Sequence, residues 1–512
     1  MTWGPTSTRR CFAAATTFAL LALGACSSSD DAAEPTDGGT ATTASTGGSA
    51  LPTAGELLDV ASLTKATGTD GRVYLADADG RALQLRGFNI KTQDPLADVT
   101  DQALTDANER GFNLLRLSVY WHLFEPEQGQ FDEAYLADID TALDRAAAHG
   151  ITVIVSFHQD IFGPAFGDAG IPEWATRTDG ASYTKQDLWL LNYLEPAVQN
   201  AWEHLYEDDD LRVAQATAWT TVAERVADHP SVIGYDLLNE PFGKFREGEP
   251  ITESVRRVQA EQLTPMYQRL IDAMRPIDPD AWMFVEAPNV ASIGAPISLG
   301  PLDDDKVVFF PHLYDPNIET ANYTEGKAEL DLSFFEMYEP LITTYATDND
   351  LPLMIGEWGL GAPDKPGMDQ FVAESIALMD RIGSGWTMFT WCRGESYCPI
   401  DAEGNDRPNI GQIVQPWARA IAGAPTSFGY DPESHVLRIV FDDNDATGTT
   451  DLYLAEDIAY PDGYVITTSD ADGEWSSIYD AATGIASVTT PESDGTHAIC
   501  VSPEASPAPC EI

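Results

Sequence analysis

Two glutamates stand where apolar, β-branched stretches of this sequence stop. Glu240 closes the run VIGYDLLNE, and Glu357 lies near the end of PLMIGEWG. Pro241 cannot donate to a continuing strand ladder, so a buried strand should end at Glu240. Retaining cleavage of a glycosidic bond needs one carboxyl group to protonate the leaving oxygen and a second, about 5–5.5 Å away, to attack the anomeric carbon. The two strand ends therefore predict a retaining glycosidase, with Glu240 as acid/base and Glu357 as nucleophile.

Arg116 is a third residue of interest. It lies in LLRL, an apolar segment that should be buried. A buried guanidinium needs an acidic partner. We expect that partner to be Glu357, because the positive charge would keep the nucleophile ionised. A structural ion pair elsewhere is the alternative.

Other polar or aromatic residues also follow apolar segments and are candidates for substrate binding: His158, Asp160, Asn239, His312, Tyr314 and Trp391. The Asn239 amide is placed to bond a sugar 2-hydroxyl, and the Trp391 ring to stack on a sugar. Each residue alone predicts no more than a satisfied polar core position. Their recurrence at corresponding places of a repeating pattern favours a site.

These side chains require strands whose C-terminal ends meet. Residues 54–424 repeat a pattern of strand, loop and helix, with eight predicted strands at Leu83–Lys91, Leu114–Trp121, Thr152–Asp160, Val232–Pro241, Trp282–Pro288, Val307–Tyr314, Leu353–Gly359 and Trp386–Arg393. Helical stretches lie between several of them, at Tyr135–His149, Ala214–His229 and Thr252–Arg275. Such alternation predicts parallel pairing and an α/β fold, the (β/α)8 TIM barrel, whose chemistry lies at the C-terminal face.

Residues 425–512 change character. Predicted strands at Val436–Phe441, Asp451–Ala455, Tyr464–Thr468 and Ile485–Thr489 follow one another without intervening helices. This pattern predicts a small C-terminal antiparallel β-sandwich domain. A structural role and carbohydrate binding are both open for it.

The N-terminus carries a targeting signal over residues 1–26. Arg9 and Arg10 precede a short apolar run that ends in LGAC, which resembles a lipoprotein cleavage box with Cys26 as the lipidated residue. An ordinary secretory signal is the alternative, and the choice between Sec and twin-arginine export stays open. Residues 27–53 are rich in Ser, Thr, Gly and Ala and predict a flexible linker. We expect an exported protein, either a cell-surface lipoprotein or a secreted one.

The strongly acidic composition limits which kinds of partner the protein can bind. Asp and Glu number 82 against 28 Lys and Arg, which argues against a nucleic-acid partner.

Of six cysteines, Cys392 with Cys398 and Cys500 with Cys510 are natural local disulfide pairs, although four cysteines allow three connectivities. The scattered histidines predict no metal site, and we expect no cofactor and a monomer.

Taken in order, the motifs GFNIK, FHQD, DLLNEP, HLY and EWG resemble clan A glycoside hydrolases of family 5, and within that family the endoglycoceramidases. The resemblance implies hydrolysis of the β-bond between an intact oligosaccharide and ceramide. It also implies that Lys91, His158 and Asp160 hold the sugar nearest that bond. His312, Tyr314 and Trp391 would complete the site by the same matching.

The segment 161–231, between the third and fourth predicted strands, is much longer than an ordinary βα loop. It contains IFGPAF, IPEW and LWLLNYL, which would suit a slot for an acyl chain. The alternative is that these groups pack a small core of their own.

Three other functions stay open. A relative that prefers galactose-linked ceramides, or a family 5 retaining β-glycanase acting on cellulose, mannan or β-glucan, would use the same two glutamates. A non-catalytic surface binder of glycans or glycolipids would be expected to lack one of them.

Overall fold

The computed structural model describes residues 57–318, 332–361, 365, 367–394, 397–407, 410–491 and 495–512. The predicted signal at 1–26, its Cys26 and the predicted linker at 27–53 lie outside the described residues. Among the helices that are described, none is both long and apolar enough to cross a bilayer.

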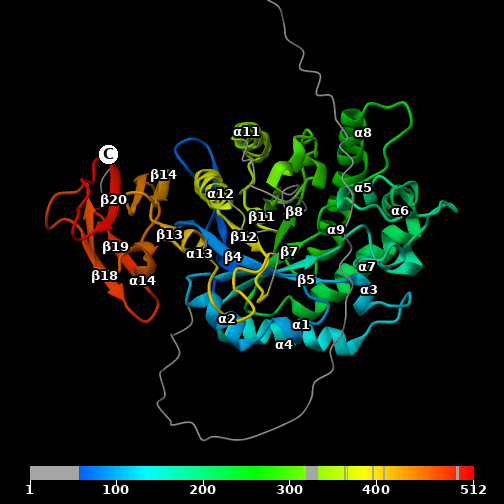
Figure 1. Cartoon of the computed structure of the whole chain (residues 1–512), viewed down its shortest axis with the longest axis horizontal. Helices are drawn as coiled ribbons and strands as arrows, with labels where there is room; N and C mark the ends of the chain where they lie inside the picture. Colours follow the sequence, from blue (N-terminus) through cyan, green and yellow to red (C-terminus); the bar gives the residue numbers. More distant parts are fainter. Residues whose placement is uncertain are drawn as a thin grey trace, which may run out of the picture.

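Nine strand segments form one parallel sheet in the order β10-β11-β12-β4-β5-β6-β7-β8-β9. Its two outer members, β9 (Val307–Phe309) and β10 (His312–Leu313), are consecutive pieces of one strand, so the sheet closes on itself (Figure 1). A parallel bridge between Phe309 and Leu353 completes the closure. The other strands are β4 (Leu85–Ile90), β5 (Leu114–Val119), β6 (Thr152–Phe157), β7 (Val232–Asp236), β8 (Trp282–Val285), β11 (Ile355–Gly359) and β12 (Gly385–Phe389). The predicted (β/α)8 barrel is confirmed.

Several strands are shorter than predicted at their C-terminal ends. β7 stops at Asp236, although the buried residues continue through Leu237 and Leu238. Their backbone leaves the regular ladder, because Asn239 N–H donates to the carbonyl of Phe157 at the end of β6. Burial alone therefore does not mark the strand end, and the residues beyond it form the rim that carries the site.

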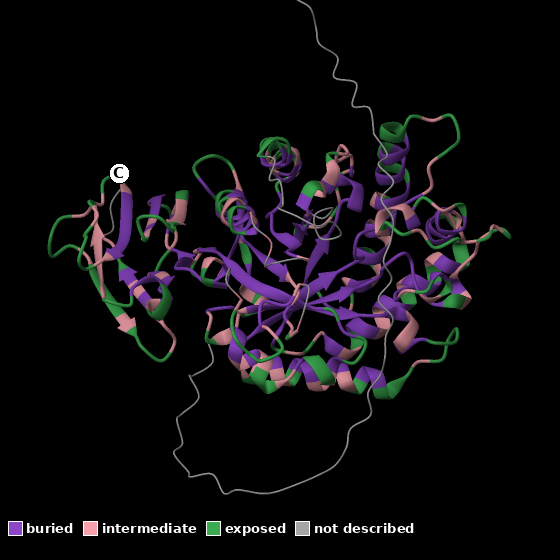
Figure 2. Ribbon diagram, viewed as in Figure 1, coloured by how far each residue is buried: buried purple, intermediate pink, exposed green. Residues whose placement is uncertain are grey.

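Helices surround the barrel and bury their inward faces (Figure 2). In α4, for example, the Asp132 side chain caps the N-terminus, and Leu136, Ile139 and Leu143 are buried. The longer helices are α2 (Asp101–Asn108), α4 (Glu133–Ala148), α6 (Pro196–Glu207), α7 (Asp209–Val226), α9 (Thr264–Met274), α11 (Ser333–Asp348) and α12 (Met368–Ile382). The shorter ones are α1 (Pro95–Asp98), α3 (Trp121–Phe124), α5 (Trp189–Asn192), α8 (Ile251–Arg257) and α13 (Ile410–Ile413). The helix predicted at Thr252–Arg275 is divided into α8, a π-helical turn (Val258–Leu263) and α9.

The N-terminal strands are β1 (Thr64–Thr67), β2 (Val73–Ala76) and β3 (Ala82–Leu83). They pack at the end of the barrel where its strands begin. Leu63, Leu75 and Leu83 share one apolar cluster with residues near the starts of the barrel strands, such as Leu114 and Ile154. This cluster closes the N-terminal end of the barrel, so the cavity described below opens at the opposite end.

The C-terminal lobe, drawn in orange and red in Figure 1, is a β-sandwich as predicted. One sheet has the order β1-β2-β3-β13-β16-β19-β18 and the other β14-β15-β20-β17. Their C-terminal members are β13 (Trp417–Ile421), β14 (Ala424–Asp431), β15 (Val436–Asp442), β16 (Thr450–Tyr453), β17 (Tyr464–Thr468), β18 (Ser476–Asp480), β19 (Ile485–Thr489) and β20 (Thr496–Pro503), with α14 (Glu456–Ala459) between β16 and β17. The first sheet takes strands from both sides of the predicted boundary at residue 424, because β13 pairs with β3 on one edge and with β16 on the other. The sequence did not predict that the N-terminal strands would enter this sheet.

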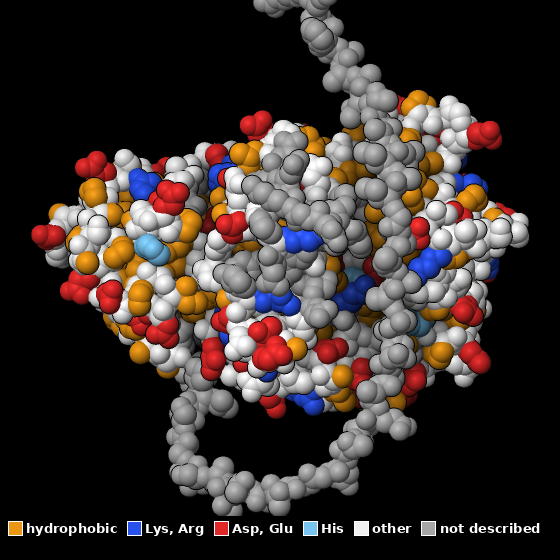
Figure 3. All heavy atoms as spheres, in the orientation of Figure 1, with side chains coloured by type: hydrophobic (Ala, Val, Ile, Leu, Met, Phe, Trp, Pro, Cys, Tyr) orange, Lys and Arg blue, Asp and Glu red, His pale blue; other side chains and the backbone are white. Residues whose placement is uncertain are grey.

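Both predicted disulfides are confirmed, Cys392–Cys398 beyond β12 and Cys500–Cys510 at the C-terminus. On the face shown in Figure 3, acidic side chains are scattered over both lobes with lysines and arginines among them. The described part of that face has no basic stripe of the kind that follows a nucleic-acid backbone.

Arg86 of β4 joins the barrel to its surroundings. Its guanidinium pairs with Asp380 of α12 and lies 5.5 Å from the ring of Trp386 and 5.0 Å from that of Trp417 in the sandwich. Both charged groups are buried. Among the described residues, Asp380 is the carboxylate that compensates this cation.

We predict that Asp380→Asn lowers the free energy of unfolding by about 3–5 kcal/mol, because it leaves the buried Arg86 cation without a counter-charge. Urea denaturation followed by fluorescence measures the change. Asp228→Asn, at an exposed residue just beyond the C-terminal end of α7, serves as the control and should stay within about 0.5 kcal/mol of wild type. Equal stability of the two variants would contradict a role for the Arg86–Asp380 pair.

Candidate active site

A cavity of about 350 Å³ opens at the C-terminal ends of the barrel strands. Polar side chains contribute to its lining, namely Lys91, His158, Asp160, Asn239, Glu240, Asn289, Ser292, Tyr314 and Glu357. Apolar and aromatic groups line the rest, among them Leu188, Trp189, Leu190, Ile293, Pro316, Phe389 and Tyr397. The predicted polar residues therefore meet in one place, at the face where barrel chemistry is found.

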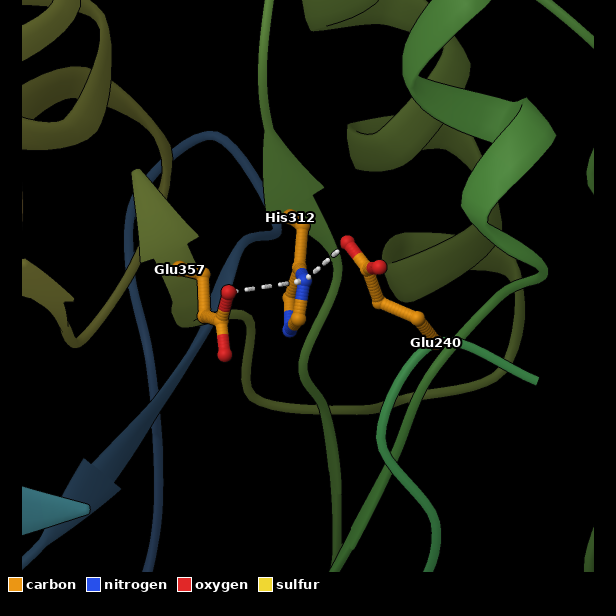
Figure 4. Close-up of side chains that lie close together, drawn as sticks. All are labelled: Glu240, His312 and Glu357. Atoms are coloured by element: carbon orange, nitrogen blue, oxygen red, sulfur yellow. Dashed lines mark hydrogen bonds and ion pairs between the residues drawn. The ribbon is translucent and has the colours of Figure 1, made fainter. Parts of the chain in front are cut away.

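Glu240 and Glu357 face each other across this cavity. A carboxylate oxygen of each and a ring nitrogen of His312 all lie within 4.8 Å of one another. Figure 4 shows the imidazole between the two carboxyl groups, with Nδ1 3.0 Å from Oε1 of Glu240 and 3.7 Å from Oε2 of Glu357. The separation suits double displacement, in which both carboxyl groups reach one anomeric carbon, and leaves no room for the wider spacing of inverting sites.

These three side chains are also the one group among the described residues whose donor atoms are close enough to hold a metal ion. Each donor already has a protein partner. Arg116 and Tyr314 bond to Glu357, and His312 bonds to Glu240. The chemistry of two carboxyl groups and one imidazole is that of proton transfer and nucleophilic attack.

Glu357 is held as an anion. Its Oε1 accepts from Nη1 of Arg116, and its Oε2 accepts from the Tyr314 hydroxyl at 3.1 Å. Burial by itself would raise the pKa of Glu357, but the positive charges of His312 and Arg116 lower it below the ordinary value. A carboxylate that stays ionised in a buried position is ready to act as a nucleophile.

Glu240 sits on a strained turn after β7. Its φ of 40° lies in the left-handed region, which costs energy for a residue with a side chain. The N–H donates to Oε2 of Glu286 at 2.7 Å, and the carbonyl accepts from Nε2 of Gln159 at 3.0 Å. Bonds on both sides of the peptide thus maintain a conformation that the turn would not adopt alone.

Arg116 is fully buried at the centre of the barrel mouth. Besides Glu357, its nitrogens bond to Asp236, Asn89, Asn239 and Glu286. Burial by itself would lower its pKa, but the charges of Asp236, Glu357 and Glu286 raise it instead. The predicted pairing of Arg116 with Glu357 is present, within a larger network.

Lys91, Asp160 and His158 form a chain on the other side of the cavity. Nζ of Lys91 lies 2.5 Å from Oδ2 of Asp160, which lies 3.5 Å from Nε2 of His158. Nδ1 of His158 is 4.0 Å from Glu357 Oε1. The Lys91 charge keeps the pKa of Asp160 low in spite of burial, so a cation and an anion are both available to sugar hydroxyls.

Comparison with known proteins assigns the family. Residues 76–395 match the model "Cellulase (glycosyl hydrolase family 5)". The chain belongs to glycoside hydrolase family 5. Residues 415–501 match the glycoside hydrolase family 5 C-terminal domain, in agreement with the sandwich.

The similar family 5 proteins include endoglycoceramidases. Endoglycoceramidase I of Rhodococcus hoagii is 28% identical over 416 residues, which cover 77% of this chain and 80% of the relative. The endoglycoceramidase of Cyanea nozakii is 27% identical over 449 residues, covering 78% and 86%. The solved structure of endo-glycoceramidase II from Rhodococcus sp. with ganglioside GM3 superposes with a TM-score of 0.74 at 26% identity, over 84% of this chain and 99% of that one.

Two predicted site residues of this family 5 chain are placed differently from expectation. Trp391 does not line the cavity; it is buried, with its ring 5.5 Å from that of Phe88 and 5.7 Å from that of Phe112. The regular strand ends at Phe389, and that ring lines the cavity instead. Asn239 does line the cavity, but its Oδ1 accepts from Arg116 and its Nδ2 donates to the Gln159 carbonyl.

Sequence reasoning missed Phe389, Tyr397 and Glu286. Phe389 is the last residue of β12, and a rule placing site residues at the strand end would have found it once the strand was bounded correctly. Glu286 follows β8 in FVEAP, in the same position relative to its strand that marks the other site residues. Tyr397 lies beyond the strand pattern, near the Cys392–Cys398 disulfide, and no signal in the sequence identifies it.

The long segment 161–231 serves both of the purposes considered. Ile161, Phe162 and Phe166 are buried in the main core, so part of it packs structurally. Leu188 and Trp189 line the cavity, and Leu188 is 47% exposed. An apolar wall therefore faces solvent beside the turn that carries Glu240.

We predict that Tyr314→Phe moves the acidic limb of the pH profile of kcat/KM upward by about 0.4–1 pH unit. The hydroxyl stabilises ionised Glu357, so its loss raises the pKa of that carboxyl and the nucleophile becomes protonated at a higher pH. Initial rates with an aryl glycoside between pH 3 and 9 measure the shift. Tyr345→Phe, whose ring packs on Phe309 outside the barrel, is the control. An unmoved limb would show that this hydrogen bond does not tune Glu357.

Proposed function

We propose that this protein is a retaining endo-β-glycosidase that hydrolyses the bond between the oligosaccharide and the ceramide of glycosphingolipids. One observation carries the proposal: the carboxyl pair within 4.8 Å lies in a cavity with a polar side at Lys91 and Asp160 and an apolar wall at Leu188 and Trp189. A substrate with a sugar half and a lipid half matches both sides. The endoglycoceramidase relatives support the same substrate class.

The catalytic roles follow from the contacts. Glu357, ionised by Arg116 and His312, attacks the anomeric carbon and forms a glycosyl-enzyme ester. Glu240 gives its proton to the glycosidic oxygen, so ceramide leaves as a neutral alcohol. A water molecule then loses a proton to Glu240 and attacks the anomeric carbon, which releases the sugar and restores both carboxyl groups.

The remaining site residues bind and orient the sugar. Lys91, Asp160 and His158 line the cavity beside Glu357, where the sugar that becomes attached must lie. Phe389 offers an aromatic face on the same side, 5.9 Å from Nζ of Lys91. The Trp189 ring lies 4.9 Å from that of Tyr193, which lies 5.2 Å from the ring of Phe242, two residues beyond Glu240. The apolar wall is therefore on the Glu240 side of the cavity, where the leaving group departs.

The apolar wall also favours a glycosphingolipid substrate over the alternative functions. A β-glycanase acting on cellulose or mannan would place another sugar beside Glu240, where Leu188 and Ile293 offer no hydrogen-bonding group and Trp189 offers a single N–H. Asn289 and Ser292 are the polar side chains on this part of the lining. A non-catalytic binder has no use for two carboxyl groups that share an imidazole. An endogalactosylceramidase-type relative differs only in the first sugar, and the substrate panel below separates it.

We predict that the purified protein releases free ceramide and an intact oligosaccharide from lactosylceramide or ganglioside GM3. It should show little activity on galactosylceramide, cellulose or mannan. Thin-layer chromatography with mass spectrometry of both products measures this. Glu357→Gln is the matched control, and it should lose on the order of 10⁴-fold in kcat without losing the fold.

Release of glucose oligomers from cellulose with no ceramide from the glycolipids would contradict the substrate assignment. Near wild-type activity of Glu357→Gln would contradict the nucleophile. Faster cleavage of galactosylceramide than of lactosylceramide would move the protein to the galactose-linked class.

We also propose that the protein is exported and anchored by a lipid on Cys26. The LGAC sequence after a short apolar run supports this, and an anchor would hold the enzyme at a surface where lipids are abundant.

We predict that Cys26→Ala moves the protein from the detergent phase to the aqueous phase of a Triton X-114 extract, when it is expressed in a bacterium that processes lipoproteins. Incorporation of labelled palmitate should disappear together with the partitioning. Ser27→Ala is the neighbouring control and should behave as wild type. Aqueous partitioning of the wild-type protein would favour an ordinary secretory signal.

A further inference from the structure

Glu286 is a buried acid that the catalytic roles above leave unused. It follows β8, is 1% exposed, and is not among the residues that line the substrate cavity. Its two oxygens nevertheless contact three members of the site. Oε2 accepts from the N–H of Glu240 at 2.7 Å, and Oε1 lies 3.0 Å from Nη2 of Arg116 and 3.1 Å from Nε2 of His312.

Two of these contacts lead to Glu240. The bond to its N–H holds one side of the strained turn, whose φ is 40°. The contact with His312 reaches the Glu240 carboxyl through the imidazole, because Nδ1 of the same ring is 3.0 Å from Glu240 Oε1. Glu286 thus touches the acid/base residue from its backbone and from its side-chain partner.

The His312 ring lies between the carboxyl groups of Glu286 and Glu240 and contacts both of them. An imidazole nitrogen beside a carboxylate keeps its proton, and this decides what the other nitrogen can do. With Glu286 3.1 Å from Nε2, Nδ1 of the same ring faces Oε1 of Glu240 at 3.0 Å, close enough to exchange a proton with it. Burial alone would lower the pKa of His312, but the charges of Glu286 and Glu357 raise it, so the ring can carry a proton beside the acid/base residue.

The contact with Arg116 has less consequence for Glu357. Arg116 reaches Glu357 through Nη1, whereas Glu286 approaches Nη2. Asp236 holds the same guanidinium through both Nε and Nη2, and Asn89 holds Nη1 at 2.9 Å. Removing one of several partners leaves the arginine fixed, and so leaves the nucleophile charged.

We propose that Glu286 is a positioning residue for the acid half of the reaction, which sets the backbone and the proton partner of Glu240 without taking part in the attack by Glu357. The proposal rests on the proposed glycosidase function. It predicts a dependence on the leaving group, because ceramide leaves only with a proton whereas 2,4-dinitrophenolate leaves without one.

The test compares kcat/KM of Glu286→Gln on lactosylceramide and on 2,4-dinitrophenyl β-lactoside. Burial raises the pKa of Glu286 to about 8, and glutamine keeps the shape and an acceptor for the Glu240 N–H but removes the titrating carboxyl group beside His312. We expect a loss of about 30–100-fold on the glycolipid and less than 5-fold on the aryl glycoside, the pattern also expected of Glu240→Ala in a stronger form. Because one preparation serves both substrates, any unfolded fraction cancels in the ratio.

Asp278→Asn is the control. Asp278 is a buried carboxyl just ahead of the same strand, where it accepts from the Tyr235 hydroxyl at 2.7 Å, far from the cavity. It should change both activities by the same factor. Equal losses on both substrates for Glu286→Gln would reduce Glu286 to a structural residue and overturn the proposal.

A second variant and a second pair of substrates cover the cases in which the first comparison cannot be made. If Glu286→Gln yields no folded protein, His312→Gln breaks the same chain of contacts, and an unchanged ratio of the two activities would overturn the proposal. If the wild-type protein does not cleave lactosylceramide, the substrate assignment fails, and methylumbelliferyl against dinitrophenyl lactoside still tests Glu286 separately.

Discussion

The buried guanidinium of Arg116 holds together the strand ends at the mouth of this barrel. Arg116 is excluded from water, which would be prohibitive for an isolated charge. Asp236, Glu286 and Glu357 approach it from three different strands of the sheet. Because the cation and the anions are each costly to bury alone, the strand ends that carry them have one arrangement in which all are satisfied. The catalytic geometry and the closure of the barrel are therefore parts of the same electrostatic problem.

The two catalytic carboxyl groups have different surroundings. Glu357 is surrounded by donors and positive charge, whereas Glu240 faces an imidazole and a backbone held by another carboxyl group. The two environments differ although the side chains are within 4.8 Å. Arg116 of β5 and Tyr314, just after β10, hold Glu357 as an anion, whereas the strained turn after β7 fixes the position of Glu240.

The sequence predicted what depends on local pattern. Apolar runs that stop at Glu240 and Glu357 identified the strands and the catalytic pair, and the spacing of the cysteines identified both disulfides. It was less successful where tertiary contacts decide. Trp391 was expected to stack on a sugar, but β12 ends two residues earlier and Phe389 takes that position. Glu286 follows its strand as the other site residues do, but its three partners come from other strands, and no spacing along the chain records those contacts.

The pairing of the N-terminal strands with the C-terminal lobe was invisible to the sequence for the same reason. β3 and β13 are separated by the entire barrel along the chain, yet they are hydrogen-bonded neighbours.

That pairing joins the first described strands of the chain to its C-terminal lobe. β1, β2 and β3 pair with one another, but the free edge of β3 meets β13 only after the chain has passed through the whole barrel. Removing residues 425–512 would take away β16 and expose the edge of β13 that it covers, so neither lobe keeps a complete sheet without the other.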